Sequence, residues 1–256
     1  MWRGQPSVTY LICCAERTGS TLLGDALIGT GIAGRPQSYF NRAAHFNPRY
    51  QRLLGSAKND DDYLDRVVAA ATTPNGVFGA KVHWQHLLNL VAMVERDLLP
   101  AESRAAASGF ERLHGRFPGL CYIRLTRANK VARAISHYRA EKTGRWRADA
   151  RWVTDDTGGA GEPDFDFEAI DAFVRRGEAE DAHWRQFFHT HGISPLELTH
   201  EELVRDIEGT VRRVLAFLDI RADGLELPPS SLRQQADHRS REWELRYRQM
   251  CAEEDG

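Results

Sequence analysis

The sequence lacks the marks of a membrane protein, a secreted protein and a nucleic-acid-binding protein. The apolar stretch at residues 8–15 is too short to span a bilayer, and no basic segment precedes it as in a cleavable leader. We therefore expect a cytoplasmic protein. Lysine and arginine together number 34 against 36 aspartates and glutamates, so no general positive charge is available to hold a polymeric nucleic acid. Any anion site must be local.

Cysteine is also scarce, with four residues in the chain. Cys13, Cys14, Cys121 and Cys251 do not have the spacing of a metal site, and the neighbours Cys13 and Cys14 should point to opposite faces of a strand. We interpret all four as reduced, small apolar residues rather than as redox or metal-binding groups. The sequence thus predicts no metal site.

What the chain has is an ordinary globular composition, 42% hydrophobic and 27% charged. Its 256 residues suffice for one α/β domain, which we expect to cover residues 1–256. Strand-type and helix-type patterns alternate along the chain, and this predicts a central, mainly parallel sheet with helices on both faces. The expected strands are residues 7–14, 77–84, 120–126 and 194–199.

Between these strands, amphipathic or capped segments predict helices. The expected helices are residues 20–31, 60–72, 85–99, 128–144 and 167–192, two pieces within 200–220, and the basic tail 232–250. Residues 32–50 have no clear period and predict a structured loop, and residues 101–119 a broken helix with a loop. Residues 144–167 form either a linker or a mobile active-site loop.

One stretch, "YLICCAERTGSTLLGD" at residues 10–25, ends a buried strand in a cation, a glycine and hydroxyls. A strand, a glycine turn and a helix that starts with hydroxyl residues present unpaired N–H groups and a positive dipole end to one point. Arg17 could add a charge-assisted contact with an anion there, and Ser20 and Thr21 could donate hydroxyl hydrogen bonds. The alternative is a simple helix N-cap by Ser20 with Arg17 in solvent.

This loop is not a Walker A motif. That motif requires a lysine directly after Gly19 and a glycine five residues before it, where Ser20 and Cys14 stand. The missing lysine removes the group that reaches the β and γ phosphates of a triphosphate, and no strand-terminal aspartate for magnesium stands out. ATP hydrolysis is therefore a poor fit.

A second candidate for anion binding follows the third predicted strand. Arg127 ends that strand, and Ser136 lies nine residues further on, in the next helix. Both can face the crevice at the carboxyl edge of the sheet, where ligands bind in open α/β folds. The alternative, a surface arginine and a neutral helical serine, loses weight because the first loop should end at the same edge.

These residues resemble those of a sulfotransferase that depends on 3′-phosphoadenosine 5′-phosphosulfate (PAPS). The wider chain is similar to the bacterial trehalose 2-sulfotransferase family and its lipopolysaccharide and Nod-factor relatives. The resemblance implies a P-loop-like three-layer fold, PAPS as donor, a carbohydrate or glycolipid acceptor, no metal and a homodimer. Its segments are "YLICCAERTGSTLL", "TGIAGRPQSYF", "TPNGVFGAKVHW", "IRLTRANKVARAISHYRAEKTGRW", "EGTVRRVLAFL" and "RQQADHRSREWELRYR".

The resemblance also implies roles for single residues around the donor. Those at its 5′ phosphosulfate are Arg17, Thr18, Gly19, Ser20 and Thr21. Arg127 and Ser136 take the 3′-phosphate. A C-terminal segment that closes over the nucleotide adds Arg233, Gln235 and Arg239 as further candidates; without the resemblance, this tail would be an amphipathic surface helix.

The chain departs from this family at the catalytic base. Trehalose-specific enzymes carry a glutamate, proposed as the base, where this chain has Ser38, which we keep as an acceptor-side residue. His83 and His86 follow the second strand, and an imidazole titrates near neutral pH, so they are candidate catalytic residues. Taken singly, each is more simply read as a polar surface histidine. Further candidates for the base are His45, Glu16 and Glu141.

Tryptophans near the expected acceptor pocket could stack on a sugar ring, although core packing explains most tryptophans. Trp84 and Trp146 fall within family-like segments and are candidate substrate-binding residues, and Trp152 lies in the long loop. Lys81 could line the pocket or be exposed. Two other functions stay open, a small-molecule kinase that uses ATP and an inactive nucleotide-binding protein.

Overall fold

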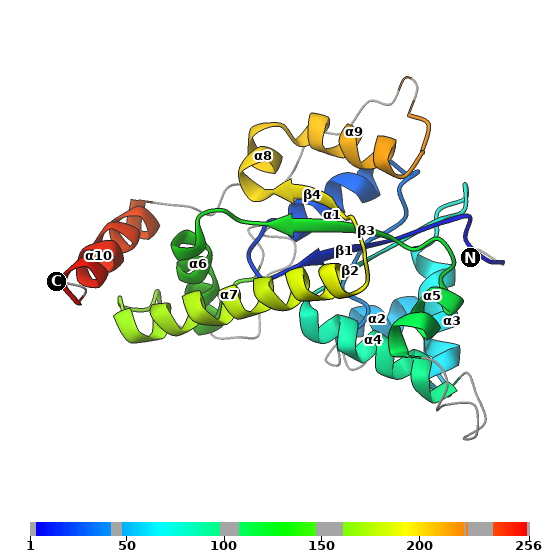
Figure 1. Ribbon diagram of the computed structural model, residues 1–256, viewed down its shortest axis with the longest axis horizontal. Helices are drawn as coiled ribbons and strands as arrows, with labels where there is room; N and C mark the ends of the chain where they lie inside the picture. The colour runs from blue at the N-terminus through cyan, green and yellow to red at the C-terminus, as the bar shows by residue number, and fades with distance from the viewer. Residues whose placement is uncertain are drawn as a thin grey trace.

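The sheet of the computed structural model has four parallel strands in the order β2-β1-β3-β4 (Figure 1). The structure describes residues 4–41, 48–97, 108–146, 161–222, 224 and 238–254. The strands are β1 (Val8–Cys14), β2 (Val77–Val82), β3 (Cys121–Thr126) and β4 (Leu196–Thr199). All four predicted strands and their parallel arrangement are therefore confirmed.

Helices connect the strands and cover both faces of the sheet, which confirms the predicted three-layer α/β fold (Figure 1). Their bounds are α1 (Ser20–Gly29), α2 (Pro48–Leu54), α3 (Asp60–Ala71), α4 (Trp84–Asp97), α5 (Gly109–Arg116), α6 (Lys130–Thr143), α7 (Phe167–Thr190), α8 (His200–Arg205), α9 (Ile207–Phe217) and α10 (His238–Glu254). In the described part of the chain, no helix combines the length and the apolar character needed to cross a membrane.

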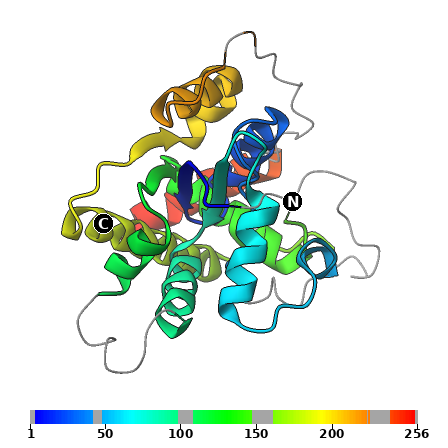
Figure 2. The same cartoon turned by 90° about the vertical axis from the view of Figure 1, so that its right-hand side faces the viewer.

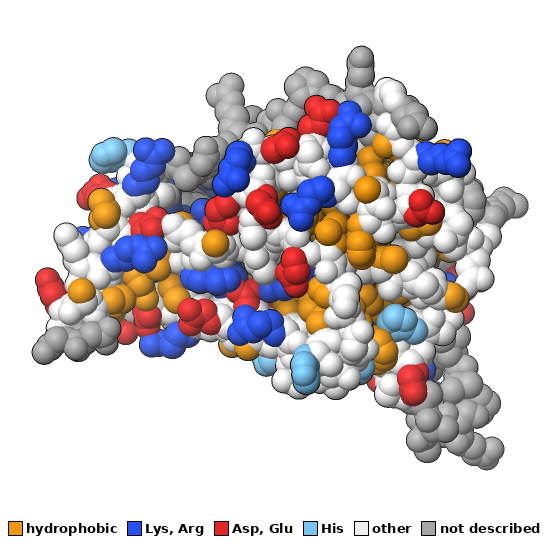
Figure 3. Space-filling view, turned by 45° about the horizontal axis from the view of Figure 1, so that its top comes forward, with side chains coloured by type: hydrophobic (Ala, Val, Ile, Leu, Met, Phe, Trp, Pro, Cys, Tyr) orange, Lys and Arg blue, Asp and Glu red, His pale blue; other side chains and the backbone are white. Residues whose placement is uncertain are grey.

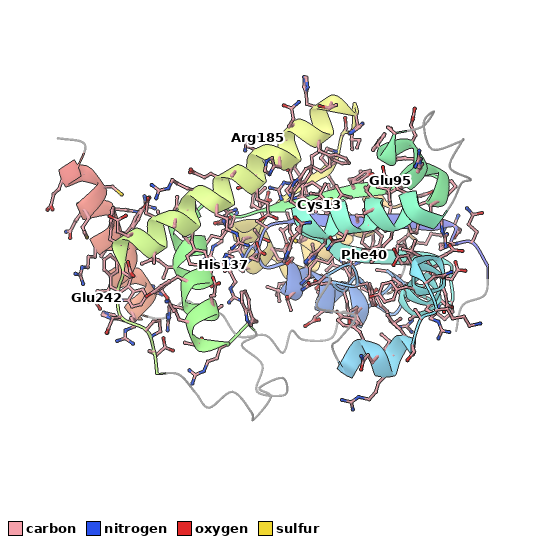
Figure 4. All side chains as sticks on the ribbon, turned by 90° about the horizontal axis from the view of Figure 1, so that it is seen from below. Cys13, Phe40, Glu95, His137, Arg185 and Glu242 are labelled. Atoms are coloured by element: carbon pink, nitrogen blue, oxygen red, sulfur yellow. The ribbon has the colours of Figure 1, made fainter. Side chains whose placement is uncertain are left out.

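The alternation of side chains along β1 builds the two cores. Leu11 and Cys13 face α3, α4 and α7 (Cys13 is labelled in Figure 4). Ile12 and Cys14 face α1, α8 and α9, which Figure 2 shows on the other side of the sheet. The prediction that Cys13 and Cys14 point to opposite faces is confirmed.

The register aligns the carboxyl ends of the three neighbouring strands β2, β1 and β3. Cys13 on β1 lies level with Val82 on β2 and Arg124 on β3. The segments that follow these strands therefore leave the sheet at one edge. This is the edge that carries the predicted anion loop.

Residues 32–50, predicted to be a loop, differ from the structure at their end, because α2 begins at Pro48. A proline suits the first turn of a helix, since its fixed φ is helical and its missing N–H would be unpaired there anyway. Nearer the start of this segment, Gln37 runs beside β2 and accepts a hydrogen bond from the Lys81 N–H (2.9 Å). The loop prediction holds there, where no helix or strand forms.

A third apolar cluster attaches the C-terminal helix α10, which lies at one end of the molecule beside α6 (Figure 1). Trp243 and Tyr247 of α10 pack on Tyr138 of α6, and the Tyr247 hydroxyl donates to Asp171 Oδ1 at 2.6 Å. The helical prediction for the basic tail is confirmed from residue 238 onward, and residues 232–237 lie outside the described part. On the face shown in Figure 3, cationic and anionic side chains alternate without forming an extended basic region.

A buried aspartate joins β3 to α6 and α7. Asp181 on α7 contacts Arg124 of β3, and its other oxygen accepts from Lys130 (2.7 Å) and Arg133 (2.9 Å) of α6. A Cβ at Gly177 would lie 1.8 Å from Arg133 Nη2, so only a glycine lets this arginine reach the aspartate. The network fixes α6, which carries Ser136, against the end of β3.

We expect Asp181→Asn to lower the free energy of unfolding by about 3 to 5 kcal/mol, because it leaves buried cations without their counter-charge. Urea denaturation measures this change. Glu178→Gln, on an exposed position of the same helix, should stay within about 0.5 kcal/mol of the wild type. Equal effects of the two substitutions would contradict the structural role of the network.

Candidate active site

The loop after β1 turns through two residues with positive φ. Arg17 has φ 63° and Gly19 has φ 86°, and Gly19 is the N-cap of α1. A glycine brings no side chain to cap the helix, so the first N–H groups of α1 stay available for an anion. Ser20 is the first helical residue and not the cap, which overturns the simple N-cap alternative.

The same loop packs tightly against a histidine that the sequence did not single out. A Cβ at Gly19 would lie 2.6 Å from His200 Nδ1, at the start of α8 directly after β4. Burial, then the charge of Arg127, lowers the pKa of His200 to about 4, so this imidazole is neutral. Its Nδ1 is buried without a hydrogen-bond partner among the described residues. Its place at the end of the fourth predicted strand was the only available sequence signal.

The two predicted anion elements meet at this loop. Arg17 Nε donates to Ser136 Oγ at 2.9 Å, and Arg17 Nη1 donates to the Trp146 carbonyl oxygen at 2.6 Å. Arg127 Nη1 donates to the Arg17 carbonyl oxygen at 3.2 Å. Arg17 is therefore held inside the site, against the alternative that left it in solvent.

The charge of Arg127 acts on Arg17, whereas Arg127 itself is acted on by Glu201 and Glu244. Burial and then the charge of Arg127 lower the pKa of Arg17 to about 10, and burial lowers the pKa of Arg127 as well. In the described part of the chain, Arg127 Nε is buried and has no hydrogen-bond partner. Two like charges held together in a partly desolvated place favour an anion between them. The residues present thus fit a phosphate- or sulfate-bearing ligand.

The two threonines of the loop have different surroundings. Thr18 is fully buried, and its hydroxyl donates to the Ala15 carbonyl oxygen at 2.9 Å, so it stabilises the turn itself. Thr21 Oγ1 accepts from Lys81 Nζ at 3.2 Å. Lys81 reaches the loop from β2, and it thereby adds a third cation to the anion site.

The candidate histidines lie beside the loop. His83 Nδ1 is 3.4 Å from Glu16 Oε1, and the ring of His83 stacks on His86 with centroids 4.7 Å apart. Burial disfavours the His83 imidazolium, but Cys14 and Glu16 outweigh burial and raise the pKa of His83 to about 10. Burial and then His83 lower the pKa of His86 to about 3. At neutral pH, a charged His83 and a buried neutral His86 are both poor proton acceptors.

The aromatic candidates lie in different surroundings. Trp84, at the start of α4, stacks on His183 of α7 with centroids 5.3 Å apart, and its edge contacts Trp184. Trp146 is 47% exposed and meets His137 of α6, which Figure 4 marks beside α7. Trp84 is half-buried and packs against the core, whereas the carbonyl oxygen of Trp146 contacts Arg17 directly.

The remaining predicted residues are placed as follows. Ser38 is half-buried in the segment beside β2, next to the residue that pairs with that strand. Glu141 is exposed on α6. Arg239 of α10 packs over the ring of Trp243 at 5.8 Å. Arg233, Gln235, His45 and Trp152 lie outside the described residues.

This chain has a parallel sheet with a loop rich in cations at its carboxyl edge. That arrangement is typical of the α/β proteins that bind phosphate or sulfate groups of small ligands. Among the described residues, no group of histidine, cysteine, aspartate and glutamate is arranged to hold a metal ion. Residues 9–250 match the model of the Stf0 sulphotransferase family, and the chain belongs to that family. The predicted family is thereby confirmed.

Two relatives are similar along nearly the whole chain. The trehalose 2-sulfotransferase of Mycolicibacterium smegmatis is 31% identical over 268 aligned residues, 96% of each chain. The trehalose 2-sulfotransferase of Mycobacterium tuberculosis is 27% identical, over 93% of this chain and 94% of its own. A solved structure, a sulfotransferase from Alicyclobacillus acidocaldarius, is 15% identical with a TM-score of 0.47, over 94% of this chain and 90% of that one.

We expect Gly19→Ala to weaken the fold and the anion site together. An alanine at position 19 would destabilise the fold by about 1 to 2 kcal/mol because of its left-handed backbone conformation. Its Cβ would also clash with His200. Gly31→Ala is the matched control, since Gly31 has a similar φ of 71° with nothing near its added Cβ. Thermal or urea denaturation should show Gly19→Ala as the less stable variant, with partial recovery in Gly19→Ala/His200→Ala. Equal stability of the two single variants would contradict the close packing of His200 on the loop.

Proposed function

We propose that the protein transfers a sulfuryl group from PAPS to a hydroxyl group of a carbohydrate or glycolipid. One observation carries this proposal: Arg17 and Arg127 converge from neighbouring strands on a loop whose helix has no capping side chain. A nucleotide with anionic groups at its 3′ and 5′ positions would place one negative group near each of these two cations. The names of the two relatives, both trehalose 2-sulfotransferases, support a sugar as acceptor.

In this proposal the two ends of the donor bind at different residues. The N–H groups of the loop, with Arg17 and Lys81, hold the 5′ end, and Arg127 and Ser136 hold the 3′-phosphate. When bound, PAPS supplies the sulfuryl group. The Lys81 contact with Thr21 supports this assignment, because it brings a cation to the loop although the Walker lysine is missing.

The chain's own residues then favour the transfer by charge and position. Negative charge develops on the leaving phosphate oxygen, and fixed N–H donors and Arg17 stabilise it without reorganisation. Holding donor and acceptor in line adds to the rate, as in phosphoryl transfer. Trp84 with His183 on one side, and Trp146 on the other, would offer aromatic faces to the sugar.

We expect 3′-phosphoadenosine 5′-phosphate, the nucleotide product, to raise the thermal midpoint more than ATP does. Its 3′-phosphate would fill the second of the two proposed anion sites, and ATP has no such group. At a ligand concentration 100 times the dissociation constant, the stabilisation is about 2.7 kcal/mol. Arg17→Ala and Arg127→Ala should lose this effect. Arg212→Ala, at an exposed surface pair with Glu208, should keep it. Selective stabilisation by ATP would sink the proposal and favour the kinase alternative.

Transfer itself is tested with PAPS that carries labelled sulfate and a panel of sugars and glycolipids that includes trehalose. We expect label in at least one acceptor with the wild type and none with Arg17→Ala. Label in no acceptor, while the arginine variants still abolish nucleotide binding, would favour an inactive nucleotide-binding protein.

A further inference from the structure

Two carboxyl groups meet beside the anion loop. Glu16 directly precedes Arg17, and Glu180 comes from the middle of α7. Their side chains lie close enough to act on one another, and Glu180 Oε1 accepts the backbone N–H of Trp84 at 2.9 Å. Two carboxylates this close repel one another, which favours a proton on one of them.

The surroundings decide which carboxyl group titrates. Burial opposes the ionisation of Glu16, but His83 outweighs it and holds the pKa of Glu16 well below its usual range. Burial and then the charge of Glu16 raise the pKa of Glu180 to about 7. Glu16 therefore stays ionised against His83, whereas Glu180 exchanges its proton near neutral pH.

The pair is partly open to solvent. The side chain of Glu16 is 23% exposed and that of His83 is 16% exposed, so the cluster borders solvent. Glu180 holds the N–H of Trp84, whose ring stacks on the exposed His183. The carboxyl pair and the aromatic face thus lie next to one another. The other titratable groups that act on this cluster, from β1, β2, α4 and α6, are Cys14, Lys81, His86 and His137.

We propose that Glu180 is the general base of the transfer, with Glu16 and His83 as positioning residues, in place of the carboxylate that position 38 lacks. This inference rests on the proposed sulfuryl transfer. The acceptor O–H gives its proton to the Glu180 carboxylate as the acceptor oxygen forms a bond to sulfur. The bond from sulfur to the bridging phosphate oxygen breaks, and its electron pair leaves with the phosphate at the loop. No metal, oxidant or further reactant is needed.

A base with a pKa near the working pH suits this step better than the alternatives. A serine hydroxyl such as that of Ser38 does not take up a proton at neutral pH. The two histidines after β2 are protonated or buried there, as their surroundings dictate. Glu180 alone among these side chains combines a proton-accepting oxygen with a place beside both the loop and an aromatic surface.

The first test is Glu180→Gln, assayed with the acceptor that the wild type labels best. We expect kcat to fall by about 10²- to 10⁴-fold, with the thermal shift by 3′-phosphoadenosine 5′-phosphate unchanged. The wild-type rate should rise with pH through about 7 as Glu180 loses its proton, and the variant should lose this rise. Glu178→Gln, exposed on the same helix, should keep both the rate and the pH profile.

Substitutions of the two positioning residues should shift the pH profile in opposite directions. Glu16→Gln removes the negative charge that raises the pKa of Glu180, so the rise in rate should shift to lower pH. His83→Gln removes a positive charge, so the rise should shift to higher pH. A merely structural role would lower activity without moving the pH profile in opposite directions.

A direct titration supplies a readout besides activity. In protein labelled with ¹³C at the glutamate carboxyl carbons, one signal should titrate near pH 7 in the wild type and be missing in Glu180→Gln. The assignment is overturned if the wild type is active and either Glu180→Gln is equally active or the wild type shows no such signal. The proposed function is left standing in both cases. A wild type that labels no acceptor overturns both.

Discussion

The site depends on the approach of two arginines, Arg17 and Arg127, inside a partly buried loop. Their guanidinium groups repel one another, and the fold holds them together because β1 and β3 are adjacent and end at the same level. The Asp181 network keeps α6, and with it Ser136, against that edge. In the proposed function, an anion bound beside both arginines would offset this repulsion, so binding would stabilise the fold.

Charges of both signs lie close together in the site. Arg17, Arg127 and Lys81 surround the loop, where the proposed donor would carry its negative groups, and the carboxyl pair Glu16 and Glu180 lies beside His83. Glu16 connects the two groups, because it is next to Arg17 in the sequence and its side chain lies beside that of Glu180. In the proposed function, the cations would hold the donor and the carboxyl pair would accept the proton of the acceptor. In the proposed transfer, Glu180 would take the role for which position 38 offers only a serine.

Much of the fold could be predicted from the sequence, because strands and helices follow from local periodicity. The loop with Arg17 and the pair Arg127 and Ser136 could be found for the same reason, since each follows a predicted strand directly. His200 and Glu180 could not be found. Their importance comes from contacts between segments far apart in the chain, and an acidic residue on a long amphipathic helix carries no local signal. The start of α2 at Pro48 was missed because no apolar period marks it.

The most direct test of the central claim is a crystal structure of the protein with 3′-phosphoadenosine 5′-phosphate. The account predicts the 5′-phosphate on the N–H groups at the start of α1, beside Arg17, and the 3′-phosphate in contact with Arg127 and Ser136. It also predicts that Arg127 Nε, buried without a partner among the described residues, gains a phosphate oxygen. A nucleotide bound elsewhere, or with its phosphates away from both arginines, would contradict the account.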